Sequence, residues 1–445
     1  MENKFLKEFN QENSILVISS YPRKKERYSK GVCAVASFTK NTLLAIKKQN
    51  PDKKIVILTM QLNNKTEIYK EDEMLIVRCF KRNNPLSYLN LLNFARKFNN
   101  VKTVMLEFEF SSFGDVISTG SLSFVVWALF ILGKKINIII HQVLLDLREI
   151  SSHIGLSRRS LKIKAFNFAL KRFYKFLSFP AQNIIVLEDE LKNRLQNIIS
   201  GDKITVIPHG VDRQVNYTLT KASARKKLGI KSNDFVVLYF GYLTWYKGVD
   251  FLIKSFQKLN QIKEKQVKLI VAGGPSFTQG EKEHYKKFLA KTEGLAKGYP
   301  HIQITGFVAE DQIANYFKAA DLSVLPYRRF MSSSGPFSLA LSFEKPVLLS
   351  SNLGLLIESK DAKEALDKVG LSKESLTFKL NSKDLLTKII SAQKASQHKK
   401  LLAFSKVLGE KRAFDNLAPI YLKTILQNYV RIYNRKLLVS PSVTR

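Results

Sequence analysis

The stretch FVVLYFGYLTWYKGVD, from Phe235 to Asp250, combines an apolar run, a glycine loop and the start of an amphipathic segment. The apolar run predicts a buried strand that ends at Gly241, and Lys247-Gly248 precede the expected helix. Glycine lets backbone N–H groups approach an anion, a helix N-terminus offers unpaired donors, and a lysine adds positive charge. The stretch therefore predicts a phosphate-binding loop, although the Walker sequence GxxxxGK[ST] is absent.

The alternation of short apolar runs with helical patterns occurs twice along the chain. In the first half we expect strands at 15–19, 54–59, 75–79, 103–108 and 136–141, with a helix at 34–48. In the second half we expect strands at 235–240, 268–272, 303–305, 322–325 and 347–350, separated by helices at 249–259, 281–291, 310–319 and 336–343. This order is typical of parallel sheets with helical crossovers. The predicted fold class is α/β, with two Rossmann-like doubly wound domains facing each other across a cleft.

The length of 445 residues also favours two domains over one hydrophobic core. We place an N-terminal domain at 1–205 and a C-terminal domain at 206–415. Residues 221–231 are interpreted as a lysine-rich connector, and we expect a helix within 416–445 to pack back on the first domain.

Cysteine use and the polar segment 1–13 predict a cytoplasmic protein. The two cysteines, Cys33 and Cys79, lie far apart without metal-ligand spacing, so we expect neither a disulfide framework nor a metal site. Residues 1–13 are polar and unlike a signal peptide. The longest apolar stretch, 122–132, is shorter than the roughly 20 residues that span a bilayer.

The formal net charge of +35 is spread along the chain, with +15 on residues 1–205 and +20 on the rest. An even spread, without a recognisable motif, argues against a nucleic-acid-binding protein. One segment, 158–177, is different, because it has seven lysines and arginines, no acidic residue and an apolar helical face. This pattern suits either a peripheral helix on an anionic membrane or a core-facing helix with a solvated basic back.

Five segments of the second half resemble, in order and separation, the motifs of GT-B glycosyltransferases, most closely family 4 (group 1). They are VIPHGVD at 206–212, GYLTWYKG at 241–248, IVAGG at 270–274, ITGFV at 304–308 followed by AADLSVLP at 319–326, and KPV at 345–347. The resemblance implies a GT-B fold and a nucleotide-diphosphate sugar as the donor substrate, with no separate cofactor. It also implies that the domain at 1–205 binds the acceptor and that the domain at 206–415 binds the nucleotide sugar.

The resemblance also implies roles in the second domain. Lys247 would neutralise the donor diphosphate, framed by the backbones of Gly241, Gly248 and Gly274. Phe307 and Val308 would lie beside the nucleotide base, unless they only pack in the core. A solvated surface lysine is the alternative for Lys247.

In the first half the resemblance is confined to two places. Gly31, after SSYP at 19–22, corresponds to the family's glycine that approaches the diphosphate, and His141 stands where the family has a histidine facing the cleft. His141 is thus a candidate for binding the transferred sugar or the acceptor, or else a core histidine. Glu109, after an expected strand end, is a candidate for acceptor binding or general-base catalysis.

Two departures from the family's pattern concern the donor site. Tyr242 replaces an arginine, and Met331 and Leu339 occupy the positions of the paired glutamates. In their place the loop before the 336–343 helix contains Ser333, Ser334 and Gly335, preceded by two arginines, Arg328 and Arg329. Hydroxyls and free N–H groups at a helix N-terminus form an anion nest, so we expect this loop and the two arginines to bind the diphosphate, with helix capping as the alternative role of the serines.

From these patterns we expect a metal-independent glycosyltransferase that acts on a glycan or lipid-linked glycan in cell-surface polysaccharide or glycoconjugate synthesis. Two alternatives stay open: a sugar-nucleotide epimerase of the same fold, and a non-catalytic GT-B subunit. Loss of the glutamate pair leaves retention or inversion of the anomeric configuration undetermined.

Overall fold

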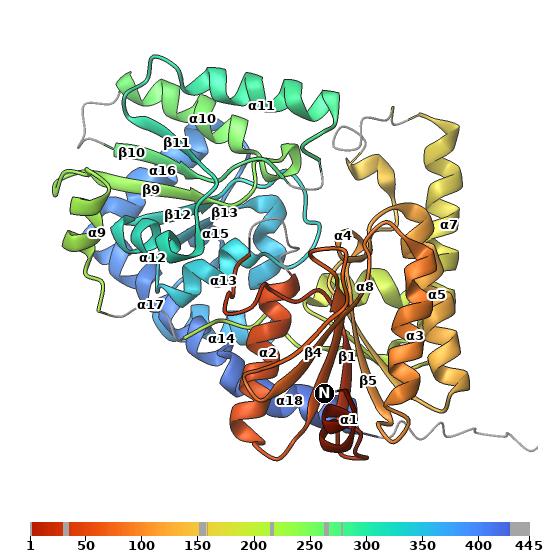
Figure 1. Ribbon diagram of the computed structural model, residues 1–445. Helices are drawn as coiled ribbons and strands as arrows, with labels where there is room; N and C mark the ends of the chain where they lie inside the picture. Colours follow the sequence, from red (N-terminus) through yellow and green to blue (C-terminus); the bar gives the residue numbers. More distant parts are fainter. Residues whose placement is uncertain are drawn as a thin grey trace, which may run out of the picture.

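The computed structural model describes residues 2–29, 35–150, 157, 159–213, 218–261, 267–276 and 279–427. Within these ranges the chain forms two α/β domains, each built on one twisted sheet, with the two sheets side by side in Figure 1. The fold class expected from the sequence is therefore confirmed.

The first domain contains an eight-stranded sheet in the order β3-β4-β2-β1-β5-β6-β7-β8. Its strands are β1 (Ile15–Ile18), β2 (Ile55–Met60), β3 (Glu67–Glu71), β4 (Met74–Phe80), β5 (Thr103–Phe108), β6 (Lys135–Ile140), β7 (Ala181–Val186) and β8 (Ile204–Val206). All pairings are parallel except that of the edge strand β3 with β4. The expected strand at 103–108 has the predicted bounds, whereas β3, β7 and β8 were not predicted.

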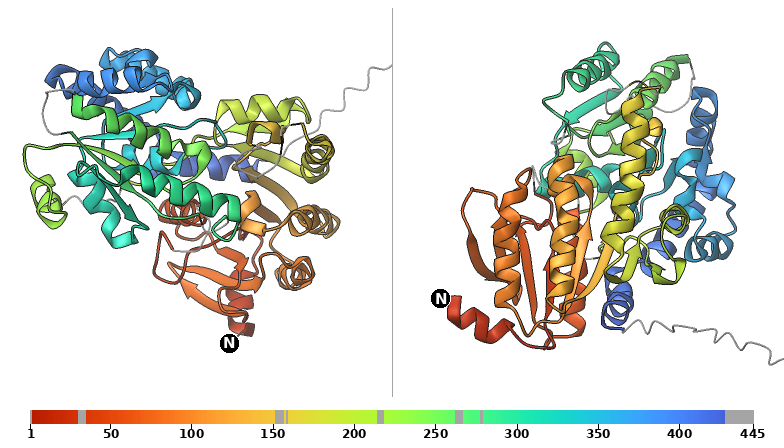
Figure 2. Two further views of the ribbon diagram at one scale, coloured as in Figure 1. Left: turned by 90° about the horizontal axis from the view of Figure 1, so that it is seen from above. Right: turned by 90° about the vertical axis from the view of Figure 1, so that its right-hand side faces the viewer.

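Helices cover both faces of the first sheet, as successive side chains of a buried strand require. In β1, Leu16 and Ile18 enter the core on one face, and Ile15 and Val17 enter the core on the other. The helices are α1 (Glu2–Phe9), α2 (Val35–Gln49), α3 (Tyr88–Lys97), α4 (Phe110–Phe113), α5 (Val116–Ile131), α7 (Leu161–Ser178) and α8 (Asp189–Gln196). Figures 1 and 2 show α3, α5 and α7 as the outer layer of this domain.

The second domain contains a six-stranded parallel sheet in the order β11-β10-β9-β12-β13-β14. Its strands are β9 (Phe235–Phe240), β10 (Val267–Ala272), β11 (Ile302–Gly306), β12 (Leu322–Leu325), β13 (Val347–Ser350) and β14 (Thr377–Phe378). Three of these, β9, β12 and β13, have the predicted bounds. The helices are α9 (Lys221–Lys227), α10 (Val249–Gln257), α11 (Glu283–Ala296), α12 (Glu310–Ala319), α13 (Gly335–Ser342), α14 (Lys360–Val369), α15 (Lys373–Leu376), α16 (Ser382–Gln393) and α17 (Ala395–Lys411).

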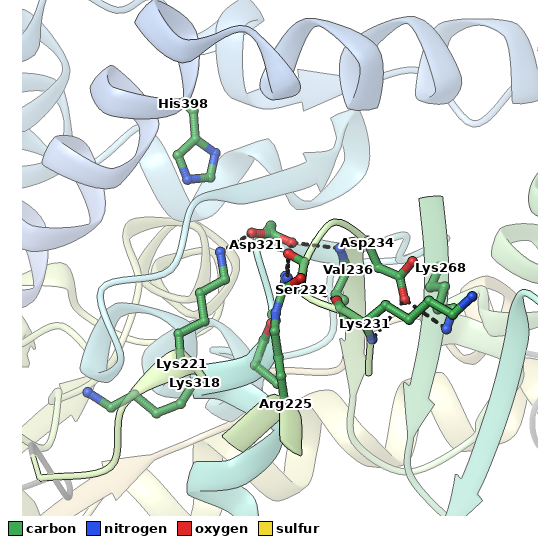
Figure 3. Close-up of polar contacts among 12 residues, drawn as sticks. Lys221, Arg225, Lys231, Ser232, Asp234, Val236, Lys268, Lys318, Asp321 and His398 are labelled. Carbon is green, nitrogen blue, oxygen red and sulfur yellow. Dashed lines mark hydrogen bonds and ion pairs between the residues drawn. The ribbon is translucent and has the colours of Figure 1, made fainter. Parts of the chain in front are cut away.

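The segment 221–231, expected to be a connector, instead begins with helix α9, so that prediction was wrong. Arg225 is buried and donates to Asp321 at 2.6 Å and to the carbonyl of Ser232 at 2.7 Å (Figure 3). Asp321 also accepts from the backbone N–H of Val236, at the start of β9, at 2.7 Å. This buried ion pair ties α9 to the ends of β9 and β12, which the lysine-rich composition of the segment concealed.

The chain crosses between the domains twice, and the two crossings pair with each other. The backbone N–H of Val211 donates to the carbonyl of Arg412 at 2.8 Å, and that of Phe414 returns to Val211 at 3.1 Å. Gly210 is required here because a Cβ would lie 2.2 Å from the Phe414 ring. Helix α18 (Phe414–Leu426) then packs against α2 of the first domain.

None of the helices in the part of the chain that the structure describes is both long and apolar enough to cross a membrane.

Candidate functional site

The strand-loop-helix at 235–250 lies at the C-terminal end of β9, where ligands bind in open parallel sheets. Gly241 has φ +125°, and the Cβ that an alanine would add there lies 3.1 Å from the Nζ of Lys247 and 3.3 Å from Cγ of Pro336. The glycine therefore leaves room for the lysine head group and for the start of α13.

Two further glycines let backbone segments approach closely around this loop. Gly248 has φ +70°, and a Cβ there would lie 2.0 Å from the carbonyl oxygen of Pro326. A Cβ on Gly273 would lie 1.9 Å from the carbonyl oxygen of Gly241. The loop after β9 thus packs directly on its neighbours, and only glycine fits at these contacts.

Lys247 belongs to a short 3-10 turn, Trp245–Lys247, and is buried. Its ammonium group lies 5.8 Å from the ring centre of Tyr327 and 6.0 Å from that of Tyr242. Burial lowers the pKa of Lys247 to about 8, and no carboxylate of the described residues forms an ion pair with it. Among the residues that the structure describes, aromatic faces are the groups that stabilise this buried cation, and an anion would complete the arrangement. The surface-lysine alternative does not fit this burial.

Arg328 contacts the loop between β9 and α10. Its guanidinium makes a bidentate pair with Asp250 in α10, at 2.7 and 2.9 Å, and donates to the carbonyl of Trp245 at 2.7 Å. A bidentate pair of this kind fixes geometry. The predicted contact of Arg328 with the diphosphate is therefore revised to a positioning role, whereas the adjacent Arg329 keeps a buried Nε that lacks a partner among the described residues.

The serine loop meets the lysine at the N-terminus of α13. Ser334 caps this helix by accepting from the backbone N–H of Phe337 at 3.3 Å, and its hydroxyl lies 3.4 Å from that of Tyr327. The hydroxyl of Ser333 is buried without a partner of good hydrogen-bond geometry in the described part of the chain. Ser334 therefore has the capping role that was the alternative for the serines. The Ser333 hydroxyl lies near the carboxyl of Glu188, and Gly335 precedes Pro336, whose Cγ and the Nζ of Lys247 both lie next to Gly241.

The positions of the missing glutamates are apolar in the structure as well. Leu339 is buried in the main core, and Met331 packs against Leu144 of the first domain. Neither side chain has a polar atom able to bond a hydroxyl group. The polar pair that the resemblance implies for the family is therefore absent from these two positions.

A cavity of about 370 Å³ opens beside the glycine turn that follows β10. Gly273, Gly274 and Gly306 line it, together with Leu243 and Lys297. Gly274 packs tightly on the backbone of Phe307, where a Cβ would lie 2.8 Å from the nitrogen. Phe307 is 40% exposed next to this turn, while Val308 is buried. Of the two residues expected beside the nucleotide base, Phe307 has an accessible side chain and the side chain of Val308 is buried in the domain.

His141 follows β6 and is buried, with its Nε2 2.5 Å from the carboxylate of Glu107 at the end of β5. Its ring also lies edge-on to Phe38, with the ring centres 4.7 Å apart. The next residue, Gln142, forms an isolated antiparallel bridge with Ser332. The histidine is thus a well-held residue at the point where the first domain touches the serine loop.

Glu109 also lies where the domains meet. It caps α4 by accepting from the backbone N–H of Ser111 at 3.0 Å. Its charge raises the pKa of Tyr246, in the loop after β9, although burial is the larger cause. Glu109 therefore faces the second domain while part of its carboxylate is used for capping.

Two residues of this interface, Glu188 and Glu310, were not predicted from the sequence. Glu188, after β7, is buried near Arg412 and Ser333, and burial raises its pKa to about 7. Glu310, at the start of α12, accepts from the backbone N–H groups of Arg27 and Tyr28 of the first domain. The sequence signal for Glu310 is an acidic residue in the first turn of a predicted helix, which is too common a pattern to indicate a domain contact.

The predicted donor-binding residue Gly31 lies outside the described residues.

Among the residues that the structure describes, no group of three or more histidine, cysteine, aspartate and glutamate side chains could hold a metal ion.

Comparisons with known proteins agree with this architecture. Residues 220–400 match the sequence model of the family described as glycosyl transferases group 1. An uncharacterized glycosyltransferase of Methanocaldococcus jannaschii is 26% identical over 189 residues, which are 40% of this chain and 45% of that protein. The alpha-galactosylglucosyldiacylglycerol synthase of Streptococcus pneumoniae is 28% identical over 201 residues, 43% of this chain and 50% of that protein. The chain thus matches at most about half the length of these two relatives.

The likeness in three dimensions extends over both domains. The crystal structure of Anabaena HepE in complex with UDP-glucose superposes with a TM-score of 0.62 at 15% identity, covering 93% of this chain and 99% of that one. The family model matches residues of the second domain alone, whereas the likeness in fold covers 93% of the chain and so includes both domains. The chain therefore has the GT-B fold and, over residues 220–400, resembles the group 1 glycosyltransferases.

Proposed function

We propose that this protein is a glycosyltransferase that moves a sugar from a nucleotide-diphosphate sugar to an acceptor bound by its first domain. The donor diphosphate lies over Gly241, between Lys247 and the N-terminus of α13. The base lies beside Phe307 and the Gly273-Gly274 turn. Glu109 and His141 face the acceptor side of the cleft.

The observation that carries this proposal is the buried ammonium group of Lys247, which lacks a carboxylate partner among the described residues. Bond cleavage at the anomeric carbon leaves negative charge on the departing diphosphate. A fixed cation that is already desolvated stabilises that charge more than a solvated lysine would, and needs no reorganisation. The buried Ser333 hydroxyl and the backbone of Gly335 supply hydrogen bonds to the same group. These protein groups can take the electrostatic role of a divalent ion, so we include metal independence in the proposal.

The acceptor part of the proposal is a glycan or lipid-linked glycan of cell-surface polysaccharide or glycoconjugate synthesis, used at the inner face of the cell membrane by a cytoplasmic, peripheral protein. Two observations support it: the basic segment 158–177, and the name of the Streptococcus relative, which describes the synthesis of a glycolipid. HepE, the structural neighbour solved with UDP-glucose, supports a uridine nucleotide as the first donor to test.

A panel of UDP-, GDP-, ADP- and dTDP-sugars tests the proposal. We expect at least one of them to raise the thermal unfolding midpoint, because a ligand that binds only the folded state stabilises it. The stabilising donor is then incubated with and without a lipid-glycan extract, with and without a chelator. Sugar transfer that requires the extract and continues in the presence of the chelator supports the proposed metal-independent glycosyltransferase. Donor consumption that is independent of the extract favours the epimerase, and donor binding without any turnover favours the non-catalytic subunit.

A further inference from the structure

Helix α5 exposes apolar side chains on a face that contains no charge. None of its sixteen residues is charged, a composition normally found in helices buried all round. Nevertheless Ile117, Phe124 and Ile131, spaced seven apart and so on one face, are 71%, 67% and 79% exposed. An unburied apolar face of this kind marks an interaction surface.

Helix α7 lies beside α5 and repeats the pattern. Leu161, Phe168 and Phe176, spaced seven and eight apart, are 76%, 62% and 41% exposed. The six side chains from the two helices are called the apolar ridge below. The two helices form the outer layer at the right of Figure 1, away from the second domain (Figures 1 and 2).

Aromatic stacking holds the ridge in place between the helices. The Trp127 ring stacks on Phe176 and on Phe179, with ring centres 5.4 and 5.3 Å apart, and its Nε1–H donates to the carbonyl of Phe176 at 3.1 Å. A groove of about 420 Å³ runs along these rings, and Arg172 and Lys175 line it with them. The ridge is thus preorganised, and its groove places cations next to apolar rings.

Positive charge surrounds the ridge without any acidic residue in α7. The exposed basic residues of this helix are Lys162, Lys164, Lys171, Arg172 and Lys175. Exposed aromatic and aliphatic groups beside lysines and arginines are the combination that binds an anionic lipid surface. Tryptophan prefers the boundary between acyl chains and head groups, and long basic side chains reach the phosphates from apolar surroundings. We propose that the apolar ridge of α5 and α7 docks this protein on an anionic lipid bilayer.

Charge distinguishes the bilayer from other occupants. A second copy of the chain, related by two-fold symmetry, would place the same cations opposite each other, which costs energy. A nucleic acid would satisfy the cations and leave Ile117, Ile131 and Leu161 exposed. Only a surface with both anionic groups and hydrocarbon matches the whole ridge.

The inference deepens the membrane part of the proposed function, on which it rests, by naming the surface that makes the contact. Vesicle binding requires no donor, no acceptor and no turnover. Failure to bind vesicles would therefore overturn this surface and the peripheral location, and would leave the proposed sugar transfer standing. If both hold, α5 and α7 bring the first domain to a membrane-held acceptor.

Cosedimentation of the full chain with vesicles tests the docking surface. We use phosphatidylcholine alone and phosphatidylcholine with one third phosphatidylglycerol. The wild type is expected to bind the anionic vesicles at least about tenfold more strongly than the neutral ones. The variant Phe124→Ser/Phe168→Ser is expected to lose about tenfold of this binding, and Lys171→Gln/Arg172→Gln/Lys175→Gln a similar amount.

Matched controls change the same residue types elsewhere on the surface. They are Leu402→Ser/Ile420→Ser for apolar exposure and Lys286→Gln/Lys287→Gln/Lys291→Gln in α11 for charge, and both are expected to bind like the wild type. Since all the changed side chains are exposed, the unfolding midpoints of the variants should match that of the wild type. If Phe124→Ser/Phe168→Ser does not fold, the binding of the charge variant alone tests the proposal. Equal binding by the wild type and the charge variant overturns the proposal. Self-association that the ridge variants abolish, or binding of an RNA oligonucleotide that displaces the vesicles, also overturns it.

Discussion

The carboxylate of Glu310 in the second domain accepts hydrogen bonds of 2.9 and 3.1 Å from the backbone N–H of Arg27 in the first. It also accepts one of 2.8 Å from the N–H of Tyr28. The side chain of Arg27 pairs with Asp212, beside the interdomain crossing, at 2.8 Å. One glutamate therefore holds a loop of the first domain against α12 of the second, three residues before Gly31.

Removal of this carboxylate should free the loop. In Glu310→Ala the N–H groups of Arg27 and Tyr28 lose a charged acceptor, an interaction of about 1.5–3 kcal/mol. Amide hydrogen exchange over residues 23–29 is expected to become at least about tenfold faster. The adjacent exposed Asp311→Ala serves as the control and should leave this exchange unchanged. Unaltered exchange in Glu310→Ala would show that other contacts hold the loop.

Lys247 predicts an unusual pH dependence of stability in the absence of ligand. Its pKa falls from 10.5 unfolded to about 8 folded, so between these values the unfolded state binds more protons and stability rises with pH. The rise is about 3 kcal/mol, at 1.36 kcal/mol for each unit. The free energy of unfolding is measured with denaturant at pH 7.5 and pH 10.5. Relative to the wild type, Lys247→Met should be more stable at pH 7.5 than at pH 10.5, whereas the exposed Lys254→Met should change with pH as the wild type does. The same change in stability between the two pH values in all three proteins would show that Lys247 is not a buried charge.

Glu188 should act in the opposite direction. Its carboxyl titrates near 4.5 unfolded and about 7 folded, so the folded state binds more protons between these values. Stability is then fully present below pH 4.5 and falls by about 3 kcal/mol as pH rises through 7. Glu188→Gln, which stays neutral, should remove this loss, whereas the exposed Glu281→Gln should retain it. The same unfolding series from pH 4.5 to 7.5 measures both, and an identical slope in the two variants would contradict the burial of Glu188.

Alanine substitutions at two glycines of similar φ distinguish the energetic cost of backbone conformation from the cost of tight packing. Gly248 and Gly133 have φ of +70° and +75°, but a Cβ on Gly248 would lie 2.0 Å from a Pro326 oxygen, while nothing lies within 4 Å of one on Gly133. Gly133→Ala should cost about 1 kcal/mol from the positive φ alone. Gly248→Ala should cost at least about 2 kcal/mol more, because the backbone of Pro326 must move. Equal losses in chemical denaturation would show that the β9–α10 loop is not tightly packed.

The sequence was sufficient where local pattern and burial agree. Strands β5, β9, β12 and β13 are short apolar runs bounded by turn residues, and their predicted bounds are those of the structure. The edge strand β3 was missed because the sequence EIYKE is polar and alternates weakly. The α9 helix was missed because its buried residues are a small alanine, Ala224, and a charged arginine, Arg225, which give no apolar periodicity.

The site was predictable only as a set of nearby motifs. Spacing brought Gly241, Lys247 and the serine loop together, since all follow strands of one parallel sheet. Sequence spacing did not show that Arg328 forms an ion pair with Asp250, because these two residues are 78 positions apart in the chain. Contacts between the domains, such as those of Glu188 and Glu310, depend on how two separately folded units dock, and no local pattern encodes that.

The affinity of Lys247 variants for a nucleotide diphosphate tests the central claim most directly. Using the nucleotide of the stabilising donor, titration calorimetry at pH 7 compares the wild type, Lys247→Met, Lys247→Arg and the control Lys254→Met. We expect the methionine variant to bind at least about tenfold more weakly, since a hydrogen bond to a charged group contributes about 1.5–3 kcal/mol, while the control matches the wild type. The arginine should restore little, because its planar fork needs more room than the space beside Gly241 provides. Wild-type affinity in Lys247→Met would contradict the claim that this buried lysine binds the donor diphosphate.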